Sequence, residues 1–366
     1  MIDRRLITNF DWTLLALVLA ACALGVVNIY SASASYAPAG TPFYIKQLYW
    51  ILVGLLLIVV VCSLDYHLFE DVAYWLYGIL CLLLVVVLVV GKTSMGATRW
   101  LHLGFFSIQP SEPMKIVAIM TLARFFTNYA TVGGLTLKDL LYPVLFLGAP
   151  ALLIMKQPDL GTAILVILIA GSMMAYLGIR LSALVTCVLA AIPAVYISWS
   201  YYLRDYQKNR ILDFLDPERD PLGSGYHIIQ SKIAVGSGGV LGKGFMRGTQ
   251  SQLRFLPEQH TDFAFSVFAE EWGFIGCLLL LVLYLLIILW GLHIARRCND
   301  RFGSLMAVGV TAMLFWHIVI NIGMVIGIFP VVGVPLPLFS YGGTSMITSM
   351  IGIGILLNIS MRRFMF

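Results

Sequence analysis

The sequence predicts an all-α polytopic membrane protein with about ten transmembrane helices. Three observations lead to this fold class: an apolar composition, long apolar runs, and polar segments that gather between those runs. Hydrophobic residues make up 60% of the 366 residues and charged residues only 11%, and the mean hydropathy is +0.92. A soluble domain needs far more charge to cover its surface. The composition therefore excludes an ordinary soluble enzyme or binding module.

The apolar runs define the predicted spans, since a helix needs about 20 residues to cross roughly 30 Å of hydrocarbon. The predicted spans are residues 12–31, 47–64, 73–90, 111–128, 140–155, 160–178, 182–202, 262–294, 304–328 and 342–360. The fifth is short and the eighth is long, so we expect a kink or a re-entrant turn near either. The whole chain, 1–366, is interpreted as one transmembrane domain in which residues 203–261 form a large loop between the seventh and eighth helices.

The Lys and Arg residues of the short loops predict the orientation. They are more frequent on the side of the N-terminus, which places both termini in the cytoplasm and residues 203–261 outside. The formal net charge is +5, and the basic residues are scattered. They fit membrane topology and contacts with anionic headgroups, and they do not predict a nucleic-acid partner.

Five polar segments fall on the predicted outer face. They are residues 96–100, 109–115, 156–159, 203–262 and 340–345. Charge at the edge of a membrane is costly and usually marks a functional site. This convergence is the main functional signal in the residues themselves.

Glu112 and Lys115 stand three residues apart at the start of the fourth predicted span, a spacing that puts them on one helix face. Ser111 is expected to cap this helix, whose positive dipole end would point outward. Lys115 could then hold a phosphate or diphosphate, or the two residues could form an ion pair that fixes the helix end. The spacing alone leaves both interpretations open.

Asp262 begins the eighth predicted span. It could cap the helix, because Asp is among the best N-cap residues, or it could act as a general base on the outer face. Glu270 and Glu271 follow deeper in the same span and point to different helix faces. They could relay protons or line a polar cavity.

Further candidates lie in the other outer segments. Asp159 flanks a sharp connection with Lys156, and a structural salt bridge is the more frequent role for such a pair. Arg99 and Ser345 are additional candidates for contacts with a substrate.

The large loop is basic, and its Arg210 and Lys232 are candidates for binding an anionic substrate. Its glycine-rich stretch 236–244 resembles a phosphate loop only weakly, and a flexible loop is the better interpretation. No Cys/His cluster, HExxH or DxD-type motif predicts a metal site. These features leave three classes open: a lipid-substrate enzyme, a transporter or a structural scaffold.

Several long motifs resemble the SEDS family of bacteria (shape, elongation, division and sporulation). They are GYHIIQSKIAVGSGG at 225–239, FLPEQHTDF at 255–263, QPSE at 109–112, KQPDLGT at 156–162 and SYGGTS at 340–345. The resemblance covers nearly the whole chain. GTQSQL at 248–253 is similar to the elongation members rather than the division members.

The resemblance implies a glycosyltransferase of the bacterial cytoplasmic membrane. Such a protein polymerises lipid II, the undecaprenyl-diphosphate-linked disaccharide-pentapeptide, into β-1,4 glycan strands on the outer face. Because the donor linkage is α, the reaction would invert the anomeric carbon. The competing transporter class is a lipid II flippase, which would need polar residues along a path to both faces.

The resemblance also implies partners and roles. The family works with a class B penicillin-binding protein, a transpeptidase, among other proteins of the elongation machinery. Its essential carboxylate falls on Asp262 and its paired charges on Glu112 and Lys115. We expect Asp262 to be the base, with Lys115 and Arg210 on the leaving diphosphate. A divalent cation, Mg²⁺ or Mn²⁺, could assist there, although no dedicated cage of oxygen ligands is evident.

Overall fold

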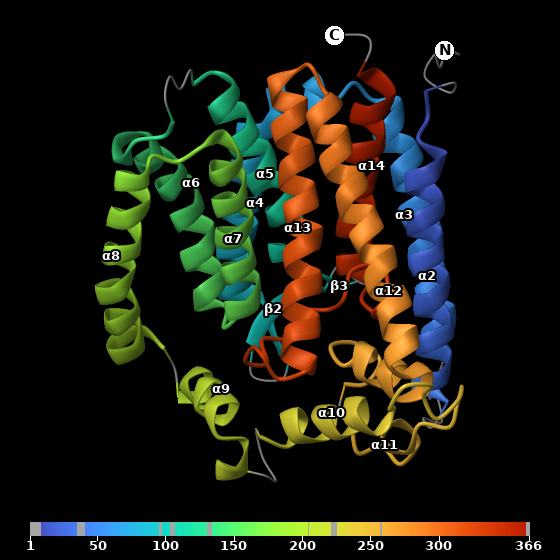
Figure 1. The fold of residues 1–366 in the computed structure, drawn as a ribbon. Coiled ribbons are helices and arrows are strands. Elements are labelled where there is room, and N and C mark those ends of the chain that lie inside the picture. The colour runs from blue at the N-terminus through green and yellow to red at the C-terminus, as the bar shows by residue number, and fades with distance from the viewer. Residues whose placement is uncertain are drawn as a thin grey trace.

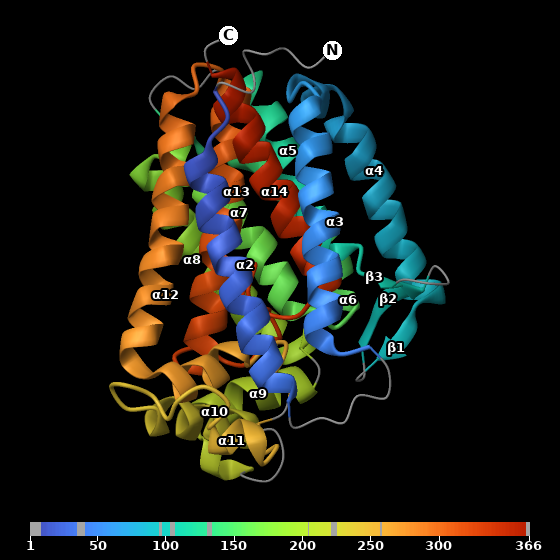
Figure 2. The same ribbon diagram turned by 90° about the vertical axis from the view of Figure 1, so that its right-hand side faces the viewer.

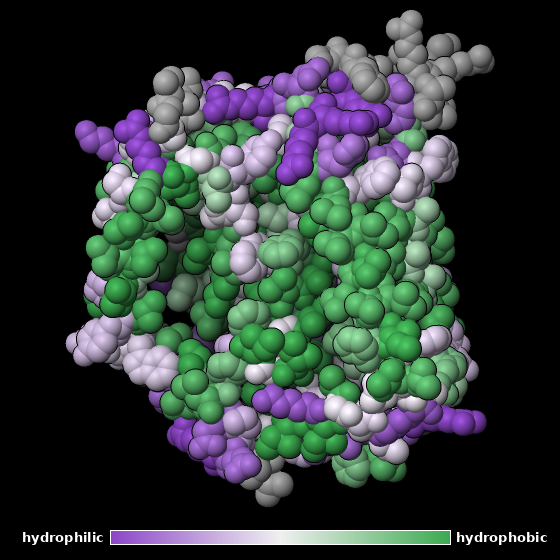
Figure 3. Space-filling view, viewed as in Figure 1, coloured by the Kyte–Doolittle hydropathy of each residue, from purple (hydrophilic) through white to green (hydrophobic). Residues whose placement is uncertain are grey.

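The structure is a computed structural model, and it describes residues 9–34, 41–94, 97–102, 107–129, 134–203, 205–220, 225–256 and 258–363. Gly96 and Pro257, which belong to segments expected on the outer side, lie outside the described residues. Helices run side by side through a layer whose surface is hydrophobic, and hydrophilic residues gather at its two ends (Figures 1 and 3). This banded surface is what a protein that crosses a bilayer requires.

Ten described helices build the layer. They are α2 (Trp12–Ser33), α3 (Phe43–Ser63), α4 (His67–Val90), α5 (Ser111–Thr127), α6 (Leu137–Lys156), α7 (Leu160–Leu177), α8 (Leu181–Ile197), α12 (Ala264–Arg297), α13 (Arg301–Val325) and α14 (Gly343–Arg362). Among the described residues, nine of them are long and apolar enough to span a membrane. The exception is α5, whose 17 residues include charges and are mostly buried inside the bundle.

Local signals explain where several helices begin. Asp11 accepts a hydrogen bond from the Leu14 backbone N–H, and Asp300 accepts one from Gly303. Such N-caps satisfy backbone donors that the first helical turn leaves unpaired. The predicted cap at Ser111 is wrong, because Pro110 occupies the N-cap position of α5 and Ser111 already lies in the helix.

The expected break in the eighth span is confirmed in α12. Gly273 has φ 62° and ψ −162°, so a short helix and a long helix meet there at a kink. A β-carbon at Gly273 would lie 2.3 Å from the backbone nitrogen of Gly242. Glycine is needed here for both its conformation and its lack of a side chain.

The large loop is not irregular. It contains α9 (Asp205–Leu215), a 3-10 helix η2 (Pro217–Arg219), α10 (Tyr226–Ser237) and α11 (Thr249–Gln252), and a π-helix η1 (Ser198–Tyr202) leads into it from α8. These elements lie at the end of the bundle opposite to the start of α2 and the end of α14 (Figures 1 and 2).

A small antiparallel sheet departs from the all-α prediction. Its strands are β1 (Lys92–Ser94), β2 (Ala97–His102) and β3 (Ser107–Ile108), paired in the order β1-β2-β3. The sheet connects α4 to α5 and lies in the half of the bundle that carries α9–α11 (Figure 2).

The centre of the bundle is formed by α13 and α14, which are mostly buried. Close approach to α3 depends on small residues, because a β-carbon at Gly54 would lie 2.5 Å from the Met350 side chain. The connection between α13 and α14 folds back into the bundle before α14 begins (Figure 1). Its residues Val332, Val334, Leu336 and Phe339 are buried, so this connection is part of the core.

Candidate active site

A cavity of about 700 Å³ opens at the end of the bundle that carries α9–α11. Its lining comes from segments far apart in the chain: α3, the small sheet, α5, α7, α9, the residues before α12, α13, the connection before α14 and the first turn of α14. The charged and imidazole side chains among the lining residues are Lys46, Arg99, Glu112, Arg210, Asp262 and His317. The volume lies within the range of about 300–1,000 Å³ that is usual for small-molecule sites.

Asp262 lines this cavity just before α12 begins. The α12 N-cap is Phe263, which makes no side-chain capping bond, so Asp262 is not the helix cap. Asn321 of α13 donates hydrogen bonds to the backbone oxygens of Asp262 (2.9 Å) and Val334 (2.7 Å). Asn321 thereby ties Asp262 to the folded-back connection. The backbone at Asp262 is therefore fixed, and the residue lines the cavity.

Electrostatics favour a base that works near neutral pH. Burial, followed by the negative charge of Glu258, raises the pKa of Asp262 from 3.8 to about 6, and the Arg210 and Arg99 charges oppose this rise. The dipole of a helix that begins beside Asp262 would by itself lower the pKa of this carboxyl, but burial outweighs that effect. A carboxylate with a pKa near 6 remains mostly ionised at pH 7 and is a stronger base than an ordinary Asp.

Glu112 and Lys115 form a buried ion pair with an Nζ to Oε1 distance of 2.8 Å. The Lys115 amino group also lies 2.7 Å from Nε2 of His317 on α13. Since the ammonium is a donor, Nε2 accepts and the Nδ1–H of His317 points to the Pro335 carbonyl at 3.5 Å. Glu112 and His317 line the cavity, whereas Lys115 is 1% exposed and lies behind them among the described residues.

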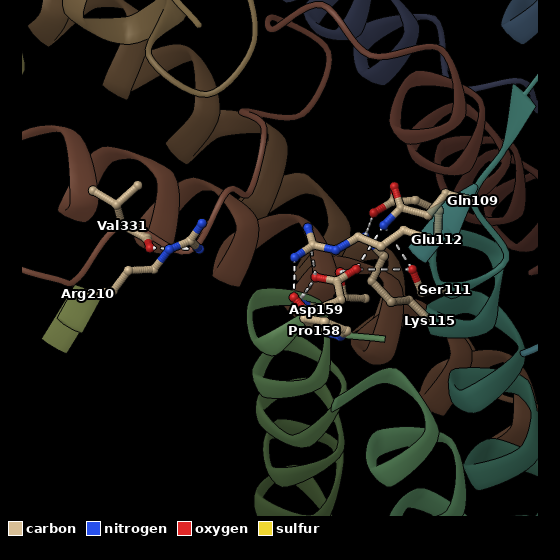
Figure 4. A network of polar contacts seen from close by, with 10 residues as sticks. Gln109, Ser111, Glu112, Lys115, Pro158, Asp159, Arg210 and Val331 are labelled. Atoms are coloured by element: carbon tan, nitrogen blue, oxygen red, sulfur yellow. Dashed lines mark hydrogen bonds and ion pairs between the residues drawn. The ribbon is translucent and has the colours of Figure 1, made fainter. Parts of the chain in front are cut away.

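Asp159 caps α7 by accepting a hydrogen bond from the Thr162 backbone at 3.3 Å, and it is buried. Its carboxylate also accepts bonds from Gln109 (2.8 Å) and Ser111 (3.3 Å), as Figure 4 shows. Arg99 approaches it at 3.8 Å and donates to the Pro158 carbonyl. Asp159 therefore pairs with Arg99, and the expected salt bridge with the exposed Lys156 does not form among the described residues.

Arg210 of α9 faces Asp159 and Glu112 across the cavity (Figure 4). Its guanidinium donates to the Val331 carbonyl at 3.3 Å. Ser345, in the first turn of α14, also lines the cavity. Lys232 does not belong to the described lining, because it lies on α10 with its side chain beside Gly327.

The glycine-rich stretch packs against the α12 kink. Lys243 and Gly244 donate backbone hydrogen bonds to the carbonyls of Glu270 and Glu271, each at 3.0 Å. The Lys243 amino group also binds the Glu270 carboxylate at 2.7 Å. The glycines allow close packing, so this stretch supports the α12 kink through defined contacts. Its composition suggested a flexible loop.

Sequence reasoning missed several lining residues. His317 is the clearest case: a histidine inside an apolar span is a recognisable signal, since such residues are rare and usually functional. Trp50 of α3 also went unremarked, whereas Trp100 and Tyr341 belong to the polar segments 96–100 and 340–345 that were expected on the outer face.

Comparisons with known proteins agree with this architecture. A family model described as cell cycle protein, covering FtsW, RodA and SpoVE, matches residues 11–364. The chain belongs to the SEDS family. Peptidoglycan glycosyltransferase MrdB of Escherichia coli K12 is 44% identical over 97% of this chain and 94% of its own length. Peptidoglycan glycosyltransferase RodA of Treponema pallidum is 35% identical over 98% of this chain and 99% of its own.

Solved structures are also similar. A chain from a peptidoglycan synthase complex that coordinates polymerization and crosslinking has a TM-score of 0.82 and 35% identity, over 97% of this chain and 98% of that chain. The rod shape determining protein RodA of Thermus thermophilus has a TM-score of 0.72 and 31% identity, over 97% and 98%. The SEDS membership expected from the motifs, with its RodA-like character, is confirmed, as is the helical multi-pass membrane fold.

Proposed function

We propose that this chain, a peptidoglycan glycosyltransferase, polymerises lipid II at the cavity described above during cell elongation. It works in the bacterial cytoplasmic membrane with both termini in the cytoplasm and the α9–α11 end outside. The bias of Lys and Arg residues in the short loops supports this orientation. The cavity then opens on the side where glycan strands grow.

In the proposed reaction Asp262 takes the proton from the 4-hydroxyl of the acceptor sugar as that oxygen attacks the anomeric carbon of the donor. The bond to the diphosphate breaks in the same displacement, which inverts the anomeric centre. Arg210 and Arg99 neutralise the charge that develops on the diphosphate. Both guanidinium groups line the same cavity as Asp262, and both lower its pKa, so their charges act at this carboxylate.

For Lys115 we propose a positioning role in place of the diphosphate contact expected from sequence. Its amino group is enclosed by Glu112 and His317, so we assign it to positioning these two lining side chains. The second oxygen of Glu112 is buried and has no hydrogen-bond partner among the described residues, so a sugar hydroxyl that reached it would satisfy an unpaired acceptor. Ser345 is a further polar contact for substrate, while Lys232 can act only as part of the basic outer surface.

One protein carboxylate together with the substrate phosphates would hold a divalent cation at the diphosphate site. Mg²⁺ is usually held by one or two carboxylates together with substrate phosphates. Glu112 would be the protein ligand, and the cation would add positive charge at the leaving group. The described residues hold no cluster of three or more His, Cys, Asp or Glu side chains that could bind a metal without the substrate.

We also propose that the chain works with a class B penicillin-binding protein. A similar solved chain belongs to a peptidoglycan synthase complex, which supports a partner of this kind. Other proteins of the elongation machinery would join the same assembly.

The convergence of Asp262, Glu112, Arg99, Arg210 and Ser345 on one cavity carries the proposed function. The test is polymerisation of purified lipid II by the purified full chain, with and without its transpeptidase partner and with and without a chelator. Glycan strands should form and should require the cavity residues. If lipid II is instead moved across vesicle membranes and no polymer forms, the flippase alternative replaces this proposal.

A further inference from the structure

A second cavity, of about 380 Å³, lies at the opposite end of the bundle, where α2 begins and α12 and α14 end. This end carries the start of α2 and the end of α14 in Figures 1 and 2. The lining residues are Asn9, Phe10, Asp11, Trp12, Thr13, Trp290, His293, Arg297, Ser360 and Arg363. The cavity is therefore separate from the proposed catalytic cavity by the full length of α12.

The cationic side chains of this cavity outnumber its acidic ones. Arg297 and Arg363 carry positive charge, and Asp11 is the acidic residue of the described lining. Both oxygens of Asp11 are already engaged: Oδ1 accepts from the Leu14 backbone at 3.2 Å, and Oδ2 accepts from the Trp290 indole at 2.6 Å. Asp11 thus fixes the wall of the cavity, while the arginines give the cavity a net attraction for an anion.

Two aromatic residues place this cavity at a membrane boundary. Trp12 is 65% exposed at the very start of α2, and its ring contacts Phe10 at a centroid distance of 4.7 Å. Trp290 lies near His293, with ring centroids 5.9 Å apart. Exposed tryptophans at the ends of spanning helices mark the level of the lipid headgroups.

The outer surface of α12 leads from the lipid to this cavity. Leu285 and Leu289 are exposed apolar residues, and His293 and Arg297 follow at successive spacings of four residues. Residues four apart lie on neighbouring positions of one helix side. An acyl chain along the leucines would therefore bring its headgroup phosphate to His293 and Arg297.

We propose that this second cavity binds the phosphate of an anionic phospholipid at the end of the bundle opposite the catalytic cavity. Arg297 and Arg363 bind the phosphate oxygens, His293 donates a further hydrogen bond, and Trp12 and Trp290 border the headgroup. Basic pockets between transmembrane helices are the usual sites for such lipids. The ligand would tie together the ends of three helices that are distant in sequence.

The chain offers a matched control for the test. Arg296 and Arg297 are adjacent, exposed and equally charged in the last turn of α12, but only Arg297 belongs to the described lining of the cavity. The purified full chain in detergent is titrated with phosphatidylglycerol, phosphatidylcholine or inorganic phosphate, and the melting temperature is followed. Native mass spectrometry counts the lipids that remain bound.

Phosphatidylglycerol should raise the melting temperature saturably, with one lipid retained. Arg297→Gln should weaken the apparent affinity about tenfold, the scale of one charge-assisted hydrogen bond, and Arg296→Gln should leave it unchanged. Arg363→Gln provides a second test from a different helix. Three results would each overturn the proposal. The two α12 variants could have equal effects, phosphatidylcholine could give an equal response, or inorganic phosphate could reproduce the full shift in melting temperature.

Discussion

Asp262→Asn is the substitution that isolates proton transfer from the other properties of the cavity. Asparagine keeps the size and hydrogen-bonding shape of the side chain but cannot accept the proton. Asp262 makes no helix-capping bond, so no cap is lost. We expect lipid II polymerisation to fall by roughly two to four orders of magnitude, the usual scale for loss of a general base.

The same substitution should not destabilise the fold. The pKa of Asp262 is about 6 in the folded chain, against 3.8 for the ordinary group, so the folded state binds the proton more tightly than the unfolded state. Stability therefore decreases as pH rises from about 4 to 6, and above pH 6 the ionised carboxylate costs stability. A two-unit shift corresponds to at most about 3 kcal/mol, and because Asp262 is only half-buried by surface area, we expect roughly 1 kcal/mol. Asp262→Asn removes that cost at pH 7 and should raise the melting temperature slightly.

The assay measures glycan strands formed from purified lipid II between pH 5 and 8, together with thermal unfolding. Wild-type activity should rise through about pH 6 as Asp262 ionises, whereas the residual activity of Asp262→Asn should not follow this profile. Asp262→Glu in the same preparation controls for the need for a carboxylate. Near-wild-type polymerisation by a folded Asp262→Asn chain would remove Asp262 from the mechanism.

Three further predictions follow from the cavity and the topology. The double change Glu112→Lys with Lys115→Glu should not restore polymerisation, because the cavity lining would lose the Glu112 carboxylate that is proposed to contact substrate; recovery of activity would reduce the pair to a structural ion pair. Gly333→Ala should lower turnover about tenfold or more with little loss of partner binding, since the residue has φ +72° and a β-carbon there would lie 3.3 Å from an Asp262 carboxylate oxygen; unchanged turnover would show that the carboxylate position is not critical. In a background without native cysteines, Asp216→Cys should react with an impermeant thiol reagent in intact spheroplasts and Asn299→Cys should not; the reverse pattern would invert the orientation.

The sequence was informative wherever a single physical requirement dominates. Apolar runs predicted the spanning helices because a bilayer leaves the backbone little alternative to a helix. The polar outer segments predicted most of the cavity lining, including Arg99, Glu112, Arg210 and Asp262. Charge at a membrane edge is costly enough that its position in the sequence locates a site.

The sequence was less informative where tertiary packing determines which way a side chain or a connection faces. Glu112 and Lys115 share a helix face, but only the approach of α13 determines that Lys115 is enclosed by His317. From its apolar sequence, the connection before α14 could be assigned either to a loop or to a spanning helix. It folds back into the bundle because Val334 and Phe339 are buried there. Lys232 was predicted from loop charge alone, and its side chain lies beside Gly327 rather than in the described lining of the cavity.

The buried acids of α12 bear on the choice between polymerase and flippase. Glu270 and Glu271 could have lined a polar path through the bilayer, but Glu270 holds Lys243 and Thr249, and Glu271 accepts a hydrogen bond from Ser31.

Beyond His317, towards the other end of the bundle, α13 presents Leu314, Met313 and Val310, which are all buried and apolar. A headgroup that carries a diphosphate and sugars would have to lose its hydration against these side chains, at a cost of several kcal/mol for each unpaired polar group. The polar cavity therefore ends at His317 among the described residues, and chemistry on one face of the membrane explains its shape better than passage between the two faces.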